Sequence, residues 1–155
     1  MKIKSVLLAI GLTGIVACAA APPASEQADP VYLNSGKVLP TDLPFSEAVR
    51  VGDTLYLSGQ IGNVPGTLEL TPGGIEEQTR QVMENIKTSL ETHGYSLSDL
   101  VKCTVMLADI GEWPVFNEVY KTFFEGQYPA RSAFGANGLA VGASVEVECI
   151  AVQAG

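Results

Sequence analysis

The sequence predicts an α+β fold in which one mixed β-sheet carries two helices on one of its faces. Apolar and polar residues alternate over residues 54–60, 101–107 and 144–152, the pattern of strands with one buried face. Apolar residues repeat at helical spacing over 75–93 and 112–125. The order ββαβαβ, with one extra edge strand, predicts a single sheet with both helices on the same side.

Composition limits the classes of function. The chain has 155 residues, 46% of them hydrophobic, which is enough for one domain with a packed core. Its formal net charge of −8 opposes nucleic-acid binding, which requires Lys and Arg on the binding face. Because His93 is the only histidine, the chain cannot form a His-rich metal site. We assign His93 a structural role, because the helix dipole favours its positive form at the end of the 75–93 helix.

The first residues have the pattern of an export signal. Lys2 and Lys4 precede an apolar run that is too short to span a bilayer, so residues 1–17 are predicted to be a signal peptide. The run ends in Ile15-Val16-Ala17-Cys18, which resembles the lipobox of bacterial lipoproteins and predicts lipidation of Cys18. The alternative is ordinary signal cleavage, which would release a soluble exported protein.

A tether is predicted between this signal and the folded domain. Residues 18–31 are small, polar and rich in proline, a composition that builds no core. The folded domain is expected at 32–155. Together these segments predict an exported, periplasmic protein that is held at a membrane by its lipid alone.

The first half of the domain contains a predicted hairpin. Residues 47–51 and 54–60 flank Gly52-Asp53, a two-residue turn that joins antiparallel strands. Gly59 weakens the second strand unless another group approaches its backbone closely. A short edge strand is expected at Lys37–Leu39, before Pro40. Alternation in the second hairpin strand puts Leu55, Leu57 and Gly59 on one face, and Tyr56, Ser58 and Gln60 on the other.

Both predicted helices have recognisable limits. The 75–93 helix is followed by Gly94, the residue expected just after a helix. The 112–125 helix tolerates Pro114 in its first turn. It carries an aromatic stripe that we interpret as core packing, and Asn117 lies beside this stripe, either in solvent or in a pocket. The stripe consists of Phe116, Val119, Tyr120, Phe123 and Phe124.

The two C-terminal strands carry the most suggestive charges. Arg131 stands among apolar and small residues, and its planar fork of donors requires an anion there. In the 144–152 strand the face that carries Glu146 and Glu148 becomes apolar at Ile150 and Val152, so Glu148 is expected to border a dry surface. The uncovered face of the sheet favours oligomerisation. A structural alternative for Arg131 is an ion pair with one of the two glutamates.

Two cysteines fall in predicted strands. Cys103 and Cys149 both have apolar neighbours, and we expect buried free thiols. An oxidising compartment leaves a disulfide open, because the sequence does not give the Cα separation, which must be within about 7 Å.

Six motifs are spread in order over residues 40–153. They are Pro44-Phe45-Ser46, Leu57-Ser58-Gly59-Gln60-Ile61, Gln78-Thr79-Arg80 with Asn85-Ile86-Lys87, Asn117-Glu118-Val119-Tyr120, Tyr128-Pro129-Ala130-Arg131-Ser132 and residues 145–152. Together these motifs resemble the reactive intermediate deaminase (Rid) family. This resemblance implies a homotrimer of chorismate-mutase-like subunits with substrate clefts between them.

The resemblance also implies a role for several residues. An arginine of the family binds the substrate carboxylate and a glutamate holds the hydrolytic water, and these positions match Arg131 and Glu148. Positions matching Ser58, Gly59 and Asn117 line the pocket. Two positions depart from the family pattern. Phe45 stands where deaminating members commonly carry Tyr, and Ala133 stands where they commonly carry Cys and use backbone groups.

The predicted reaction is hydrolysis of a small 2-imino or enamine acid to a 2-oxo acid and ammonia. Arg131 would hold the carboxylate, and Glu148 would orient water and pass a proton to the departing nitrogen. Neither a metal nor an organic cofactor is expected. The competing hypothesis is a non-catalytic trimer that binds a small carboxylate. RNA cleavage is the weakest hypothesis, because the chain is acidic and has one histidine.

Overall fold

The computed structural model describes residues 28–153. The predicted signal peptide at 1–17, the lipidation site Cys18 and most of the tether lie outside the described residues. The first strand, β1, begins at Val31, one residue before the predicted start of the domain. Among the helices of residues 28–153, none is long and apolar enough to cross a membrane.

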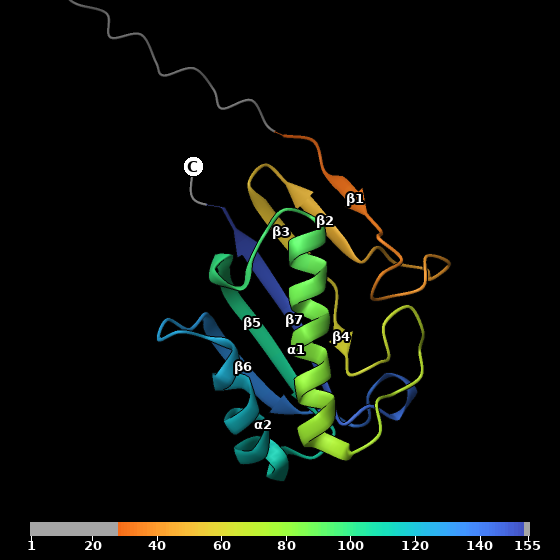
Figure 1. Cartoon of the computed structure of the whole chain (residues 1–155), viewed down its shortest axis with the longest axis vertical. Helices are drawn as coiled ribbons and strands as arrows, with labels where there is room; N and C mark the ends of the chain where they lie inside the picture. The colour runs from red at the N-terminus through yellow and green to blue at the C-terminus, as the bar shows by residue number, and fades with distance from the viewer. Residues whose placement is uncertain (1–27, 154–155) are drawn as a thin grey trace, which may run out of the picture.

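The α+β prediction is confirmed: one mixed sheet has both helices on the same face (Figure 1). The sheet order is β1-β2-β3-β7-β5-β6, and β4 also pairs with β7. All neighbouring strands are antiparallel except β5 and β6, which are parallel. The strands are β1 Val31–Leu33, β2 Ala48–Val51, β3 Thr54–Leu57, β4 Gln60–Ile61, β5 Leu100–Leu107, β6 Ala130–Gly135 and β7 Val145–Val152; the helices are α1 Gly74–Thr92 and α2 Trp113–Tyr120.

The predicted hairpin is present, but its second strand is broken. Val51 pairs with Thr54 across the Gly52-Asp53 turn, and Gly52 has a φ of 57°, which the turn requires. Tyr56 pairs with Ile150 and Gln60 with Val147, so four steps along this strand oppose three on β7. The extra residue forms a β-bulge at Ser58-Gly59.

The bulge reverses the direction of the side chain that follows it. Gln60 was predicted to share a face with Tyr56, and this is wrong. Tyr56 is 47% exposed, whereas Gln60 is fully buried beside Val147 on the helix side. An inserted residue shifts the two-residue alternation by one position, and no alternation pattern in the sequence reveals the insertion.

Helix α1 ends as the sequence predicted. Its last turn is closed by two backbone bonds, from Gly94 N to Glu91 O at 3.3 Å and from Tyr95 N to Leu90 O at 2.8 Å. Gly94 has a φ of 85°, so this is a Schellman termination that requires glycine.

Helix α2 is shorter than the predicted 112–125 segment. It ends at Tyr120 and continues as a 3-10 turn over Lys121–Phe123. The hydroxyl of Thr122 donates to the Val119 carbonyl at 2.7 Å, which gives that carbonyl a side-chain partner in the last turn. The aromatic stripe packs on the core as predicted.

The predicted edge strand at Lys37–Leu39 is wrong; the edge strand next to the β2–β3 hairpin is β1. Val38 is fully buried, but its carbonyl accepts bonds from Asn63 Nδ2 at 2.9 Å and Gly66 N at 3.0 Å. The Val38 carbonyl is therefore bonded by groups of a loop and not by the backbone of a neighbouring strand. An apolar burial signal was therefore mistaken for a strand signal.

The expectation of free thiols is also wrong. Cys103 and Cys149 form a disulfide that joins β5 to β7 across a directly opposed pair, with a Cα–Cα distance of 4.1 Å. The sequence does not show that β5 and β7 are neighbours, nor that Cys103 and Cys149 stand directly opposite each other on them. Both residues are buried on the helix side of the sheet.

Within residues 28–153, no helix covers the other side of the sheet. Tyr56, Phe134 and Val152 are exposed there at 47%, 48% and 37%. We call this surface the open face. Its apolar side chains, together with half-buried Met106 and Ile150, are typical of a surface that binds another protein chain.

Candidate functional site

Arg131 lies on the edge strand β6, on the side that faces α2. Its guanidinium carbon is 4.7 Å from the ring centroid of Tyr120 and 5.4 Å from that of Phe116. Its Nη2 donates to Asn117 Oδ1 at 2.6 Å. These partners occupy one face of α2, because residues one turn apart on a helix lie above one another. Stacking and one hydrogen bond orient the guanidinium and leave other N–H groups for a ligand.

The hydroxyl of Tyr120 is buried and has no hydrogen-bond partner among residues 28–153. Burial raises the pKa of Tyr120 to about 12, although the positive charge of Arg131 opposes this shift. The hydroxyl therefore stays protonated at neutral pH. Ala133 lies two residues after Arg131 on the same face of β6, as the predicted site requires.

Glu148 lies on the opposite face of the sheet from Arg131. Cys103 is in register with Arg131, whereas the next residue, Thr104, is in register with Glu148. Successive residues of a strand point to opposite faces, so the two side chains project from opposite sides. Strand β5 also separates their strands. Within one chain the structure does not bring the predicted pair together, and no ion pair joins them among the described residues.

Glu148 is exposed beside a shallow hollow of about 190 Å³ on the open face. Lys102, Tyr56 and Ile150 also line this hollow. A cation and two apolar side chains therefore surround the predicted water-binding carboxylate. The sequence predicted that Glu148 borders a dry surface. In the structure, the apolar part of its surroundings consists of Tyr56 and Ile150.

Glu146 points to the same face as Glu148, two residues away on β7, and it covers Gly59. A Cβ added at Gly59 would stand 2.9 Å from Glu146 Cδ and closer still to Oε1. This explains why glycine occupies the bulge, as the sequence suggested. Burial raises the pKa of Glu146, and the charge of Glu148 raises it further.

Phe45 and Ser58 lie near this bulge rather than near Arg131. Ser58 Oγ donates to Ser46 O at 2.7 Å, and Ser58 N donates to Glu47 O at 3.0 Å. Phe45 is 49% exposed. The predicted site residues thus form two groups. One is Arg131, Asn117 and Ala133; the other is Phe45, Ser58, Gly59 and Glu148.

His93 has a structural position, as predicted. Its Nε2 is 3.5 Å from Oε1 of Glu47, and both side chains are nearly buried. Glu47 also accepts bonds from Ser35 N at 2.9 Å and from Ser35 Oγ at 2.6 Å. Burial raises the pKa of Glu47, but the Ser35 and Ser89 hydroxyls, the Ser35 N–H and the charge of His93 outweigh burial. The net pKa is below its ordinary value.

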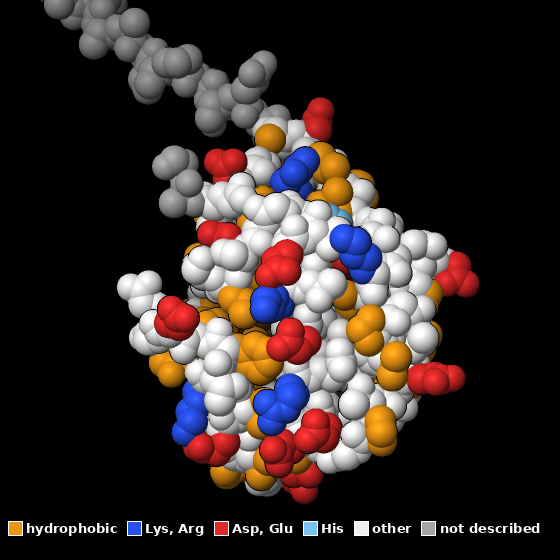
Figure 2. Space-filling view, in the orientation of Figure 1, with side chains coloured by type: hydrophobic (Ala, Val, Ile, Leu, Met, Phe, Trp, Pro, Cys, Tyr) orange, Lys and Arg blue, Asp and Glu red, His pale blue; other side chains and the backbone are white. Residues whose placement is uncertain are grey.

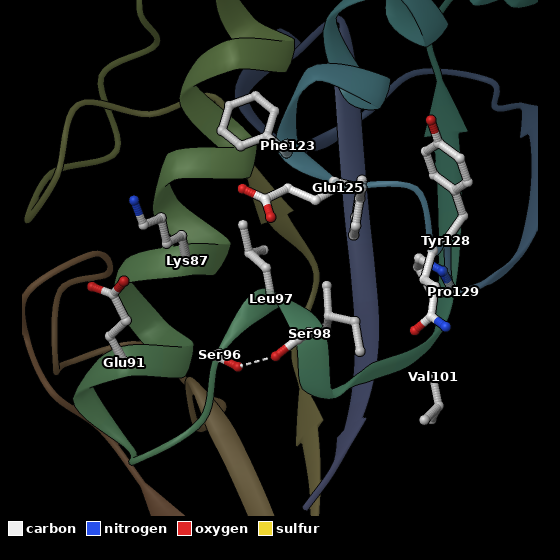
Figure 3. A pocket seen from close by; sticks show the side chains of 13 residues that line it. Lys87, Glu91, Ser96, Leu97, Ser98, Val101, Phe123, Glu125, Tyr128 and Pro129 are labelled. Carbon is white, nitrogen blue, oxygen red and sulfur yellow. Dashed lines mark hydrogen bonds between the residues drawn. The ribbon is translucent and has the colours of Figure 1, made fainter.

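A second hollow, larger than the one beside Glu148, lies elsewhere. A groove of about 950 Å³ runs between the C-terminal half of α1, residues 96–101 and residues 123–129. Figure 3 shows Lys87 and Glu91 on its α1 side, with Tyr128 and Pro129 opposite. Figure 2 shows charges of both signs spread over this helix-bearing face. Neither Arg131 nor Glu148 lines the groove, and residues 28–153 contain no cluster of three metal-ligating side chains.

Comparison with known proteins identifies the family. Residues 37–153 match the family model described as endoribonuclease L-PSP. The chain belongs to this family. It is 44% identical over 110 residues to the 2-iminobutanoate/2-iminopropanoate deaminase of Mus musculus, which covers 71% of this chain and 82% of the relative.

Solved structures that are similar to this chain share its fold, and one of them is a RidA protein, as the resemblance to the Rid family predicted. RidA from an Antarctic Psychrobacter bacterium has a TM-score of 0.74 and 40% identity, with 79% of this chain and 99% of that chain covered. E. coli TdcF with bound serine has a TM-score of 0.74 and 31% identity, with 80% and 99% covered.

Sequence reasoning did not single out Glu146 and Tyr120, which the structure places against candidate site residues Gly59 and Arg131. Tyr120 was assigned to the core, and it does pack there, while its ring also supports Arg131. Glu146 was placed on the correct face, but it was considered only as a possible ion-pair partner of Arg131. The signal for Glu146 was available in Gly59, whose missing side chain implied a close neighbour.

Proposed function

We propose that this protein hydrolyses small 2-imino or enamine acids to 2-oxo acids and ammonia, in clefts between the subunits of a homotrimer. The observation that carries this proposal is the arrangement of the two groups of site residues. Each group lies together on its own side, yet the two groups project from opposite faces of one sheet. A neighbouring subunit that sets its open face against the β6 edge would unite Arg131 of one copy with Glu148 of the next.

In this cleft Arg131 binds the substrate carboxylate with the N–H groups that Asn117 leaves free. Its stacking on Tyr120 fixes the plane of the guanidinium, and hydrogen bonds between charged partners are about twice as strong as neutral ones. Glu148 orients a water molecule toward the imine carbon. General acid–base assistance of this kind contributes about 10²–10⁴-fold. The relatives named as imine deaminases support this chemistry.

The decisive experiment is complementation between inactive variants. Arg131→Ala and Glu148→Gln are purified separately and then mixed after reversible dissociation. Imine is supplied by an amino-acid oxidase, and ammonia release is measured above the buffer rate. If each cleft takes its two residues from different copies, about a quarter of the clefts in a 1:1 mixture regain both. A mixture as inactive as its components contradicts the intersubunit site.

The competing proposal is a trimer that binds a small carboxylate without turnover. E. coli TdcF with bound serine shows that a relative of this fold accommodates an amino acid. The two proposals differ in one measurement. Binding of 2-oxobutanoate without ammonia release by the wild-type chain supports the binder, whereas release above the buffer rate supports the enzyme.

RNA cleavage finds no support in the site. The side chain of His93 is only 9% exposed and faces Glu47, so it is not presented to a polynucleotide. The net charge of −8 also opposes RNA binding.

We further propose that the protein works in the cell envelope as a lipoprotein anchored through Cys18. The disulfide between Cys103 and Cys149 supports export, because disulfides persist in oxidising compartments such as the periplasm. Labelling with a radioactive fatty acid tests the anchor. We expect label on the wild-type chain and none on Cys18→Ala; an unlabelled wild-type chain contradicts the anchor.

A further inference from the structure

Two hydrogen bonds of Ser58 join the bulge to the short segment before β2. Its Oγ donates to the Ser46 carbonyl at 2.7 Å, and its N–H donates to the Glu47 carbonyl at 3.0 Å. The register of the β2–β3 hairpin ends with the pair Ala48 and Leu57, so both bonds lie just beyond the paired residues. The position of the bulge in the proposed cleft therefore depends on what fixes this backbone.

The side chain of Glu47 fixes it from one side. Glu47 is 2% exposed, and its Oε2 accepts hydrogen bonds from Ser35 N at 2.9 Å and from Ser35 Oγ at 2.6 Å. Its backbone N–H donates to Asn34 Oδ1 at 2.9 Å. Asn34 and Ser35 directly follow β1, so Glu47 joins the edge of the sheet to the residues that hold the bulge.

The other oxygen of the Glu47 carboxyl faces the end of α1. Oε1 lies 3.5 Å from Nε2 of His93, and neither atom has a hydrogen bond among residues 28–153. The backbone N–H of His93 donates to Ser89 O at 3.2 Å and to Leu90 O at 3.0 Å, so the last turn of the helix holds this histidine. Figure 1 shows this end of α1 at the same end of the molecule as β1 and β2. A third element thereby restrains the carboxyl.

A buried carboxylate is a costly way to gain stability alone. Its charge must be desolvated, and apolar side chains of similar volume often stabilise a protein as well or better. Directional contacts with a serine and a histidine instead fix where the residue lies. Burial raises the pKa of Glu47, but hydrogen bonds from Ser35 and the charge of His93 help to bring it below its ordinary value, so the carboxyl is ionised at neutral pH.

We propose that Glu47 is a positioning residue for the proposed cleft, which holds the bulge, through Ser58, in the place that the reaction requires. Phe45 lies two residues before Glu47 in the same segment, so these contacts also place its ring. This role rests on the proposed imine hydrolysis. Glu47 is too buried to touch the substrate, and it acts only through its neighbours.

The first test compares Glu47→Gln with Leu90→Val in the full chain. Glutamine keeps the shape of Glu47 but offers His93 no charge, whereas Leu90→Val loosens the core in the same turn of α1 and removes none of these contacts. We expect Glu47→Gln to lower kcat by about 10²-fold, the cost of a displacement of about 1 Å in a site. KM should change little, because Arg131 lies on the other face of the sheet.

The control gives the effect of lost stability by itself. Leu90→Val should lower the melting temperature and leave kcat unchanged well below that temperature. Thermal melting and size-exclusion chromatography of both variants give the folded fraction by which kcat is corrected. If the two variants have the same kcat, the assignment of Glu47 is overturned.

Position 35 provides a conservative rescue that keeps Glu47 in place. Ser35→Ala removes the hydroxyl that donates to Glu47 at 2.6 Å, whereas Ser35→Thr keeps a hydroxyl there. We expect the alanine variant to lower kcat by a smaller factor than Glu47→Gln does, and the threonine variant to match wild type. If the alanine and threonine variants have the same kcat, this hydrogen bond does not position the cleft and the assignment fails.

A double-mutant cycle tests the connection through Ser58. Ser58→Ala removes the bond to the Ser46 carbonyl, so Glu47→Gln should lower kcat by a smaller factor in this background than in wild type. Its effect on the melting temperature should be the same in both backgrounds, because the contacts with Ser35 and His93 are unaltered. An equal fall in kcat in both backgrounds would overturn the connection.

Hydrogen exchange separates the role of Glu47 from the function on which it rests. The N–H of Ser58 donates to the Glu47 carbonyl, so Glu47→Gln should speed its exchange more than Leu90→Val does. This measurement needs no turnover. If wild type releases no ammonia above the buffer rate, the imine hydrolysis fails, whereas exchange at Ser58 that is equal in the two variants contradicts positioning by Glu47.

Discussion

The two groups of site residues differ in how much of their surroundings one chain supplies. Arg131 is stacked on two rings of α2 and hydrogen-bonded to Asn117, so its geometry is set before any partner arrives. Glu148 stands exposed on an uncovered sheet face, beside apolar side chains with no partner in residues 28–153. Arg131 is thus preorganised within the chain, whereas the surroundings of Glu148 are unfinished. The substrate-binding function and the assembly function should therefore respond differently to mutation.

The largest effect is expected on the open face. Ile150→Asp places a charge among apolar side chains that must be desolvated in any assembly. We expect loss of the oligomer and of all ammonia release together, measured by analytical ultracentrifugation and the oxidase-coupled assay. Val115→Asp, an exposed substitution on α2, is the control for added charge. A fully active Ile150→Asp monomer would show that one chain completes the site.

Arg131→Ala should remove activity and leave the oligomer intact. Losing two charge-assisted hydrogen bonds costs about 3–6 kcal/mol, or roughly 10²–10⁴-fold in kcat/KM. Arg131→Lys keeps the charge without the planar fork and should fall between wild type and the alanine variant. Equal activity of the lysine variant and wild type would contradict bidentate binding.

Removing the disulfide should affect stability more than activity. The Cys103–Cys149 bridge closes a segment with a sequence separation of 46, which corresponds to about 4 kcal/mol in the chain-entropy model. We expect Cys103→Ala/Cys149→Ala to lose about this free energy of unfolding in urea, with activity per folded molecule retained. Wild type in reductant is the comparison. A stable double variant with a large fall in kcat would assign the bridge to the site instead.

The buried Glu47 should make the free energy of unfolding depend on pH in the acid range. Its folded pKa is lower than its unfolded value, so the stability it contributes is complete above the ordinary value of 4.5 and is lost as pH falls through the folded value. Urea unfolding between pH 7 and pH 3 measures this loss. In Glu47→Gln, the free energy of unfolding should fall less steeply as pH decreases. If it falls as steeply as in wild type, other groups take up the protons.

The smallest effect concerns the preorganisation of Arg131. Asn117→Ala removes one hydrogen bond and leaves the stacking on Tyr120 intact. We expect a loss of about 1–3 kcal/mol in substrate binding, seen as a raised KM with kcat nearly unchanged. A fall in kcat alone would instead indicate that Asn117 contacts the reacting atoms.

The fold followed from the sequence because burial and periodicity determine it locally. The alternation in β7, the two-residue turn of the β2–β3 hairpin and the glycine after α1 are each signalled by adjacent residues. The errors arose where partners are distant in sequence. Val38 is buried against a loop, Gln60 is reversed by a bulge, and Cys149 meets Cys103 only through the strand order.

The sequence indicates candidate site residues, but it does not indicate how they are arranged. Arg131 and Glu148 carry recognisable chemistry, yet their opposite orientations depend on the parallel register of β5 with β6. No local pattern specifies that register.

The disulfide forms only when β7 pairs with β5 in the native register. A one-residue slip of β7 against β5 would turn Glu146 and Glu148 into the core and carry Cys149 to the outer side, away from Cys103. Only the native register brings the two sulfur atoms within bonding distance. A chain that has formed this bond therefore has Glu146 and Glu148 on the outer face of the sheet.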